Sequence, residues 1–175
     1  MNQSQNYFLV GPMGAGKTAV GRQLARLLNY EFIDSDEEIE LRTGVDISFI
    51  FEKEGEPGFR KREKNLINKM TERDNIVLAT GGGAILSKQN RKHLVSRGMV
   101  IYLFASIEKQ VERTHRGRER PLLSNKNPRK VLHDLMEIRD PLYRNIADFI
   151  IMTDGRKINS VAKEIFNEIT KRNSI

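Results

Sequence analysis

Cysteine is absent from the 175 residues of this chain, which excludes disulfides, a thiol nucleophile and a cysteine-ligated metal site. The absence of disulfides fits a reducing compartment, so we expect a cytoplasmic protein. A long apolar run is also missing, because the longest, 99–105, is far shorter than the roughly 20 residues of a transmembrane helix. The polar start of the chain, 1–6, leads into no apolar signal-peptide core. We therefore expect neither secretion nor a membrane partner.

Long runs of basic residues are missing too, although the chain carries a formal net charge of +7. No basic run reaches five residues, and lysine and arginine alternate with acidic residues throughout. We therefore do not expect nucleic acid as a partner. A small anionic substrate, or a merely solvated basic surface, fits this charge better. Length and composition predict one globular domain, 1–175.

The segment Gly11-Pro12-Met13-Gly14-Ala15-Gly16-Lys17-Thr18 matches G-x-x-x-x-G-K-[ST], the pattern of a phosphate-binding P-loop. Glycines let the backbone approach an anion closely, and the next helix adds the positive end of its dipole. Lys17 supplies a cation for the β- and γ-phosphates, and Thr18 supplies a hydroxyl for Mg²⁺. The apolar run 7–10 and the helical periodicity of 19–28 give the required strand–loop–helix context. The segment predicts a site for a nucleoside triphosphate and Mg²⁺.

Strands and helices are predicted to alternate along the rest of the chain. The expected strands are 7–10, 31–33, 76–79, 99–104 and 148–152. The first expected helix follows the P-loop and ends near residue 28. The others span 37–42, 47–54, 59–71, 87–97, 106–114, 128–145 and 157–172, and Pro141 is expected to bend or restart the helix in which it lies. This alternation predicts an α/β fold with a parallel sheet covered on both faces. Two segments stand out, namely a long helical insertion, 34–75, and a polar, irregular lid candidate, 115–128.

Acidic side chains follow the second expected strand at Asp34 and Asp36. Ligands of open α/β sheets bind at the carboxyl ends of the strands, so Asp34 could serve the metal and Asp36 a substrate hydroxyl. The alternative is that Asp34 only caps the following helix and Asp36 only complements its dipole.

Three further features have both a chemical and a structural interpretation. Arg60 and Glu63 share a helix face, so Glu63 could orient the Arg60 guanidinium toward a substrate carboxylate, or the two could form an ordinary surface ion pair. Gly81-Gly82-Gly83 could let the backbone pass close to a ligand, or could be a plain turn. Arginines of the lid candidate and Arg139 could stabilise charge on a transferring phosphoryl group, or could be solvated.

Six motifs in order resemble the shikimate kinases, small P-loop enzymes similar to the nucleoside monophosphate kinases. They are G-x-x-G-x-G-K-T at 11–18, D-S-D at 34–36, F-R-x-x-E at 59–63, G-G-G at 81–83, R-P-L-L at 120–123 and R-x-P-L-Y at 139–143. Each motif after the first is weak alone, whereas six with suitable spacing are specific. The resemblance implies a three-layer α/β/α P-loop kinase fold whose five parallel strands have the order 2-3-1-4-5.

The resemblance also implies roles for the matching residues. ATP is expected on Gly14, Ala15, Gly16, Lys17, Thr18, Ala19 and Arg120, and Mg²⁺ on Thr18 directly and on Asp34 through water. Shikimate is expected on Asp36, Arg60, Gly81, Gly82 and Arg139, supported by Asp34, Glu63 and Gly83. Lys17, Asp36 and Arg120 are the expected catalytic residues. Arg156, or else Arg116, is expected near adenine.

The activity implied is transfer of the γ-phosphoryl group of ATP to the 3-hydroxyl of shikimate, giving shikimate 3-phosphate and ADP on the route to chorismate and the aromatic amino acids. A monomer is expected. Two alternatives remain, namely a kinase of the same fold with another acceptor, such as gluconate or a nucleoside monophosphate, and a non-catalytic sensor that binds shikimate.

Overall fold

The fold is built around a central parallel sheet. The computed structural model describes residues 5–117, 121–123 and 127–174. The strands lie in the order β2-β3-β1-β4-β5, which confirms the order predicted above. Their bounds are β1 (Asn6–Val10), β2 (Glu31–Asp34), β3 (Ile76–Ala79), β4 (Gly98–Phe104) and β5 (Phe149–Met152).

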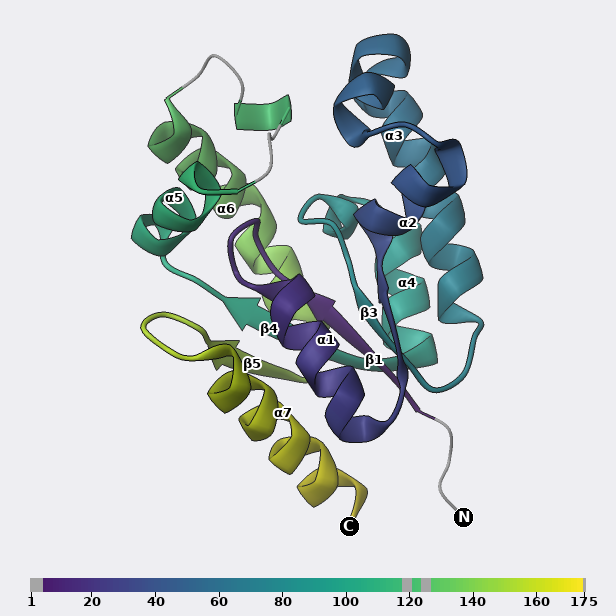
Figure 1. Cartoon of the computed structure of the whole chain (residues 1–175), viewed down its shortest axis with the longest axis vertical. Coiled ribbons are helices and arrows are strands. Elements are labelled where there is room, and N and C mark those ends of the chain that lie inside the picture. Colours follow the sequence, from purple (N-terminus) through teal and green to yellow (C-terminus); the bar gives the residue numbers. More distant parts are fainter. Residues whose placement is uncertain (1–4, 118–120, 124–126, 175) are drawn as a thin grey trace.

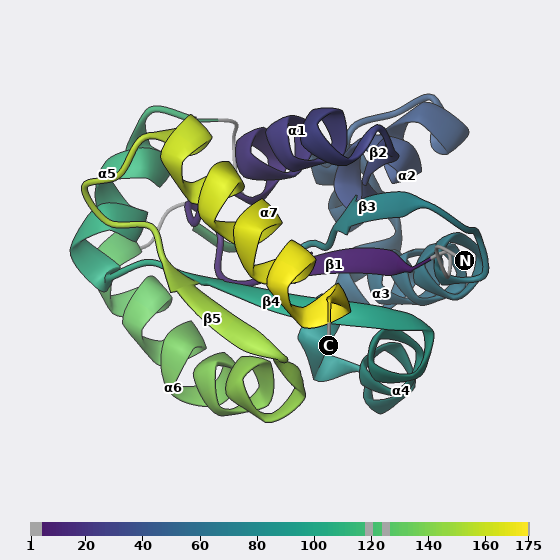
Figure 2. The ribbon, with the colours of Figure 1, turned by 90° about the horizontal axis from the view of Figure 1, so that it is seen from below.

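Helices cover both faces of this sheet and give the fold three layers (Figure 2). The α-helices are α1 (Lys17–Leu28), α2 (Ser35–Thr43), α3 (Ile47–Thr71), α4 (Lys88–Arg97), α5 (Ile107–His115), α6 (Pro128–Ile146) and α7 (Ile158–Asn173). Two short 3₁₀ helices are η1 (Ala84–Leu86) and η2 (Pro121–Leu123). Helices α1 and α7 pack on one face, and α3, α4 and α6 pack on the other. The α/β/α fold predicted from the sequence is therefore confirmed.

The strand β1 shows why both faces must be covered. Its residues alternate between the two cores, with Phe8 and Val10 on the side of α3 and α6, and Tyr7 and Leu9 on the side of α1 and α7. All four side chains are buried. A strand that is apolar on both sides is typical of a parallel sheet between two layers of helices.

The loops that follow β1, β2 and β3 meet at the carboxyl edge of the sheet. Above this edge, α2 and the first part of α3 stand on one side, and α5 and α6 stand on the other (Figure 1). The short helix η2 contacts both α3 and α6 and so lies between the two sides. This arrangement places the P-loop, the acidic end of β2 and the glycine turn after β3 around one space.

Two helix predictions differ from the structure. The break expected at 55–58 is a kink at Gly55 (φ 69°, ψ 179°), beyond which α3 continues through Pro57 to Thr71. Pro57 is tolerated there because it lies in the first turn after the kink. Helix α6 does not restart at Pro141 but runs on to Ile146, with the buried side chains of Arg139, Tyr143 and Ile146 packed beneath it.

Among the residues that the structure describes, no helix combines the length and the apolar character needed to cross a membrane.

Candidate active site

The P-loop, residues 11–18, joins β1 to α1 through backbone conformations that glycine adopts without strain. Gly14 and Gly16 have φ values of 80° and 88°. A Cβ atom on Gly14 would also lie only 3.2 Å from Cα of Gln110 in α5. Gly16 caps α1 and has no side chain with which to bind the first N–H groups of the helix. These N–H groups are thus available to an anion such as a phosphate.

The Lys17 side chain folds back over this loop. Its Nζ donates to the carbonyl oxygen of Gly11 at 2.7 Å and to that of Pro12 at 2.8 Å. The ammonium group therefore lies at the loop itself, on the same side as the backbone of residues 11 and 12. This position suits a cation that must reach a phosphate group bound by the loop.

Thr18 and Asp34 place two oxygen ligands next to each other. The Thr18 hydroxyl donates to Asp34 Oδ2 at 2.6 Å, and Asp34 Oδ1 accepts from the backbone N–H groups of Asp36 and Glu37. Asp34 is therefore the cap of α2, as the structural interpretation predicted, and its second oxygen also reaches the P-loop. A hydroxyl and a carboxylate are hard oxygen ligands of the kind that Mg²⁺ prefers, so these residues fit the expected ion.

Two carboxylates converge on the glycine turn after β3. A Cβ atom on Gly81 would lie 2.8 Å from Asp36 Oδ1 and 2.9 Å from Glu63 Oε2. Glu63 is buried, and this burial raises its pKa to about 7, against the opposing effect of Arg60 and with a further rise due to Asp36. The absence of a side chain at Gly81 is what allows both acids to reach the same place.

Arg60 is held by two acids of its own helix. Its Nη1 donates to Glu63 Oε1 at 2.9 Å, which is the predicted pair, and its Nε and Nη2 donate to Glu56 at 3.3 and 3.2 Å. Burial lowers the pKa of Arg60, but Glu63 and Glu56 outweigh this effect and keep it above its ordinary value. The guanidinium group also lies where a side chain of Gly83 would stand. Glu56 was not anticipated from the sequence.

Arg139 is a buried cation that forms no ion pair with an acid of the described residues. Its relative exposure is 4%, and no carboxylate of the described residues forms an ion pair with it. Burial lowers its pKa, and so does the nearby Arg60. Tyr143 opposes the fall, as do the carboxylates of Glu56 and Glu63. A Cβ atom on Gly82 would lie 3.4 Å from Arg139 Nη1. A buried guanidinium group of this kind is stabilised by an anionic ligand.

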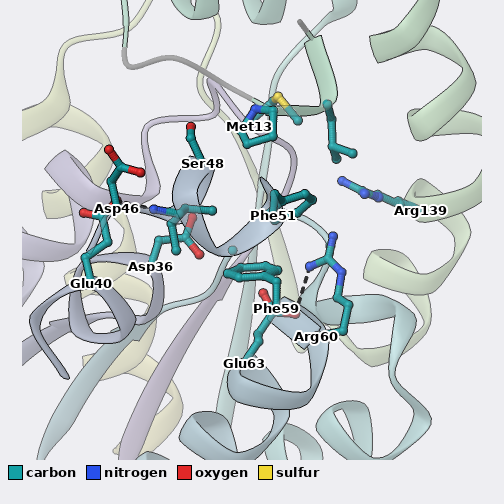
Figure 3. A pocket seen from close by; sticks show the side chains of 16 residues that line it. Met13, Asp36, Glu40, Asp46, Ser48, Phe51, Phe59, Arg60, Glu63 and Arg139 are labelled. Carbon is teal, nitrogen blue, oxygen red and sulfur yellow. Dashed lines mark hydrogen bonds and ion pairs between the residues drawn. The ribbon is translucent and has the colours of Figure 1, made fainter. Parts of the chain in front are cut away.

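These side chains line one cavity of about 260 Å³. Its lining consists of Met13, Asp36, Glu40, Asp46, Ile47, Ser48, Phe51, Phe59, Arg60, Glu63, Gly81, Gly82, Gly83, Pro121, Leu122 and Arg139. Figure 3 shows Arg60 and Arg139 at one end and the carboxylates of Asp36, Glu40 and Asp46 toward the other. Two cations thus lie at one end of the cavity, where Glu63 pairs with Arg60, and three further carboxylates lie toward the other end.

Part of the backbone of the glycine turn is hydrogen-bonded within the protein in this structure. The N–H group of Gly81 already donates to the Ser35 hydroxyl at 2.9 Å, and the Gly82 carbonyl accepts from Tyr143. A donation from Gly81 to a substrate would require its bond with Ser35 to open. What the glycines do in this structure is leave room for Asp36, Glu63 and the two arginines.

Other expected site residues lie away from this cavity or outside the described residues. Ala19 is in the first turn of α1, beside the P-loop. Arg156 donates to the Met152 carbonyl and pairs with Glu164, within a separate shallow groove along α7. Arg116 is exposed at the end of α5. Arg120, the expected lid arginine, lies outside the described residues.

Arg113 is a residue of the site that sequence reasoning missed. Its Nη1 donates to the Gly14 carbonyl at 2.9 Å and to Thr153 Oγ1 at 3.1 Å, and its Nη2 donates to the Thr153 carbonyl at 3.0 Å. It thereby ties the P-loop to the loop after β5. No local motif marks this contact, which joins residues 99 positions apart.

Comparisons with known proteins agree with this geometry. A family model described as "Shikimate kinase" matches residues 13–170. A shikimate kinase of Pasteurella multocida is 56% identical over 97% of both chains, and one of Mannheimia succiniciproducens is 56% identical over 99% of this chain and all of the other. The solved structure of a shikimate kinase from Acinetobacter baumannii in complex with shikimate has a TM-score of 0.94 and 52% identity, covering 97% of this chain and 95% of that one. The chain therefore belongs to the shikimate kinase family.

Proposed function

We propose that this chain transfers the γ-phosphoryl group of ATP to the 3-hydroxyl of shikimate, giving shikimate 3-phosphate and ADP. The observation that carries the proposal is Arg139, a buried guanidinium group without a carboxylate partner among the described residues, facing a cavity beside Arg60. The P-loop supplies the second half of the site. A cavity that needs an anion and adjoins a P-loop fits a kinase whose acceptor is a small carboxylic acid.

The two ends of the cavity suit the two ends of shikimate. Arg60 and Arg139 would bind the carboxylate through charge-assisted hydrogen bonds. The ring hydroxyls would then lie toward Asp36, which stands at the opposite side of the same space. Binding of the carboxylate thus orients the ring before reaction, which is the main contribution that phosphoryl transfer asks of a protein.

The reaction forms a bond between the 3-oxygen of shikimate and the γ-phosphorus while the bond from that phosphorus to the β–γ bridging oxygen breaks. Asp36 accepts the hydroxyl proton, and ADP departs with the electron pair of the broken bond. Lys17 and the P-loop N–H groups stabilise the negative charge on the β- and γ-phosphates. Thr18 and Asp34 would hold Mg²⁺, which would supply further positive charge to stabilise the phosphates.

Several parts of the proposal concern the chain as a whole. We treat 1–175 as one kinase domain in which 34–75 forms the shikimate-binding part and 115–128 a lid that brings Arg120 to ATP. We also propose Arg156, or Arg116, as the neighbour of adenine. A cytoplasmic monomer completes the proposal, and the absence of cysteine fits a reducing compartment.

An acceptor panel tests the proposed function. Release of ADP from ATP and Mg²⁺ is measured by a coupled assay with shikimate, gluconate or a nucleoside monophosphate as acceptor. We expect kcat/KM to be at least about a hundredfold higher for shikimate than for gluconate or a nucleoside monophosphate. These other acceptors would lose several polar contacts worth roughly 1.5–3 kcal/mol each. A preference for gluconate or a nucleotide would favour the other kinases, and shikimate binding without ADP release would favour the sensor.

A further inference from the structure

Tyr143 occupies a special place behind the end of the cavity where Arg60 and Arg139 lie. It follows Arg139 by four positions in α6, so the two side chains lie one above the other on the same helix face. Its relative exposure is only 1%, and its hydroxyl donates to the Gly82 carbonyl. Gly82 in turn lies against Arg139 Nη1, which a Cβ atom on that glycine would approach to 3.4 Å. Tyr143, Gly82 and Arg139 therefore form one contiguous group.

The charge distribution of this group agrees with the contacts. Burial raises the pKa of Tyr143 above its ordinary value, and the adjacent Arg139 guanidinium opposes the rise. The phenol consequently keeps its proton at neutral pH and donates it to Gly82, while its oxygen lone pairs remain for the cation. Tyr143 is the first of the groups that oppose the fall in the pKa of Arg139, and Glu56 and Glu63 follow, although neither forms an ion pair with it in the part of the chain that the structure describes.

A second set of contacts fixes the Tyr143 ring. It packs on the ring of Tyr102 in β4, with centroids 4.9 Å apart and planes tilted by 35°. The Tyr102 hydroxyl donates to Asp140 Oδ1 at 2.6 Å, and Asp140 Oδ2 accepts from Arg144 at 2.8 Å. Tyr102 of the sheet thus packs against Tyr143, and Asp140 of α6 fixes the position of Tyr102. A side chain so constrained can transmit a fixed position to its partners.

We infer that Tyr143 is a positioning residue for the acceptor: its hydroxyl fixes Arg139 and the Gly82 backbone relative to each other, so that the guanidinium fork meets a carboxylate in one orientation. The inference rests on the proposed function, because it concerns the same cavity. The ordinary alternative is a core tyrosine whose hydroxyl only satisfies a buried carbonyl.

The variant Tyr143→Phe separates these possibilities. Its ring still packs on Tyr102, but the hydroxyl is lost. We expect the KM for shikimate to rise about tenfold, equivalent to ~1.4 kcal/mol, while the KM for ATP stays within about twofold. The rise is expected for shikimate but not for its neutral methyl ester, because the ester makes little use of Arg139. If the variant were merely less stable, the KM values for shikimate and for its methyl ester would change by the same factor.

Tyr7→Phe is the matched control. Tyr7 is equally buried at 2% exposure, and its hydroxyl accepts from Asn173 at 3.2 Å, on the other face of the sheet. We expect both KM values to stay at wild type in this variant. An equal rise in the KM for shikimate in Tyr7→Phe and Tyr143→Phe would overturn the inference, since a general effect of losing a buried hydroxyl would then explain it.

The order of measurements keeps two failures apart. Wild-type ADP release with shikimate is measured first, and its absence refutes the proposed function. With an active wild type, an unchanged KM for shikimate in Tyr143→Phe refutes the inference alone. If circular dichroism shows that Tyr143→Phe does not fold, Tyr102→Phe decides, because it removes the bond to Asp140 that holds the ring pair. We expect about a threefold rise in the KM for shikimate there, and an unchanged KM refutes the inference.

Discussion

Replacing Arg139 by methionine should weaken the substrate site and leave the fold as stable as before, or more stable. Methionine has a similar length and fills the same space in α6 without the charge. The wild-type guanidinium is buried, and no carboxylate of the described residues pairs with it. A buried cation of this kind lowers the free energy of unfolding when no anion is bound. Its removal therefore takes away an unfavourable desolvation term and breaks no ion pair among the described residues.

The expected loss of function follows from the hydrogen bonds that the guanidinium fork can make. Two charge-assisted bonds to a carboxylate contribute roughly 1.5–3 kcal/mol each, or about 3–6 kcal/mol together. At 1.4 kcal/mol per factor of ten, kcat/KM for shikimate should fall by about 10² to 10⁴. We expect the lower end of this range, because Arg60 remains in the cavity. The KM for ATP should change little.

Stability is measured on the same samples by thermal unfolding without ligand. A gain of about 1 kcal/mol corresponds to a rise in Tm of roughly 2–4 °C for a domain of this size. Arg129→Met, in the first turn of the same helix, is the control, because Arg129 is largely exposed and pairs with the exposed Glu108. It should alter neither KM nor Tm. A Tm several degrees lower in Arg139→Met, with an unchanged KM for shikimate, would refute the reasoning and make Arg139 a structural residue.

Three further predictions concern the remaining polar residues. Lys17→Ala should abolish turnover, because the cation at the P-loop is lost, and near-normal ADP release would contradict the site assignment. Asp36→Asn should lower kcat by about 10² to 10⁴, as expected for loss of a proton acceptor, while ATP affinity measured by calorimetry stays the same. Glu63→Gln should change the pH dependence of unfolding. The pKa of Glu63 is raised from 4.5 to about 7 in the folded protein, so between these two pH values the folded state binds a proton that the unfolded state has released. The stability that this proton gives the folded state is lost as pH rises through about 7. The wild type should therefore lose about 3 kcal/mol relative to Glu63→Gln between pH 4.5 and pH 7, and parallel curves would contradict this pKa.

Local patterns predicted the parts of the site that depend on neighbouring residues. The P-loop follows from glycines at fixed spacing, and Asp34 follows from its place at the end of a strand. The predicted pair of Arg60 and Glu63 is present at 2.9 Å because three positions on a helix bring side chains together. In each case the contact is decided within a few residues of the chain, so the sequence alone contains the information.

Contacts between distant segments could not be predicted in the same way. Arg113 reaches Gly14 across 99 positions, and Tyr143 reaches Gly82 across 61. The burial of Arg139 likewise depends on how α6 packs on the sheet. Local rules led us to expect that Pro141 bends or restarts its helix, and of these two possibilities the restart is absent, because α6 continues to Ile146. Tertiary packing determined these features, and no short motif encodes it.

The most direct test compares shikimate with its neutral methyl ester in the coupled assay for ADP release. The central claim is that a P-loop kinase site recognises its acceptor by a carboxylate held between Arg60 and Arg139. We predict saturable ADP release with shikimate and a kcat/KM lower by about 10² to 10⁴ with the ester. Equal rates with both compounds, or no shikimate-dependent ADP release, would contradict the claim.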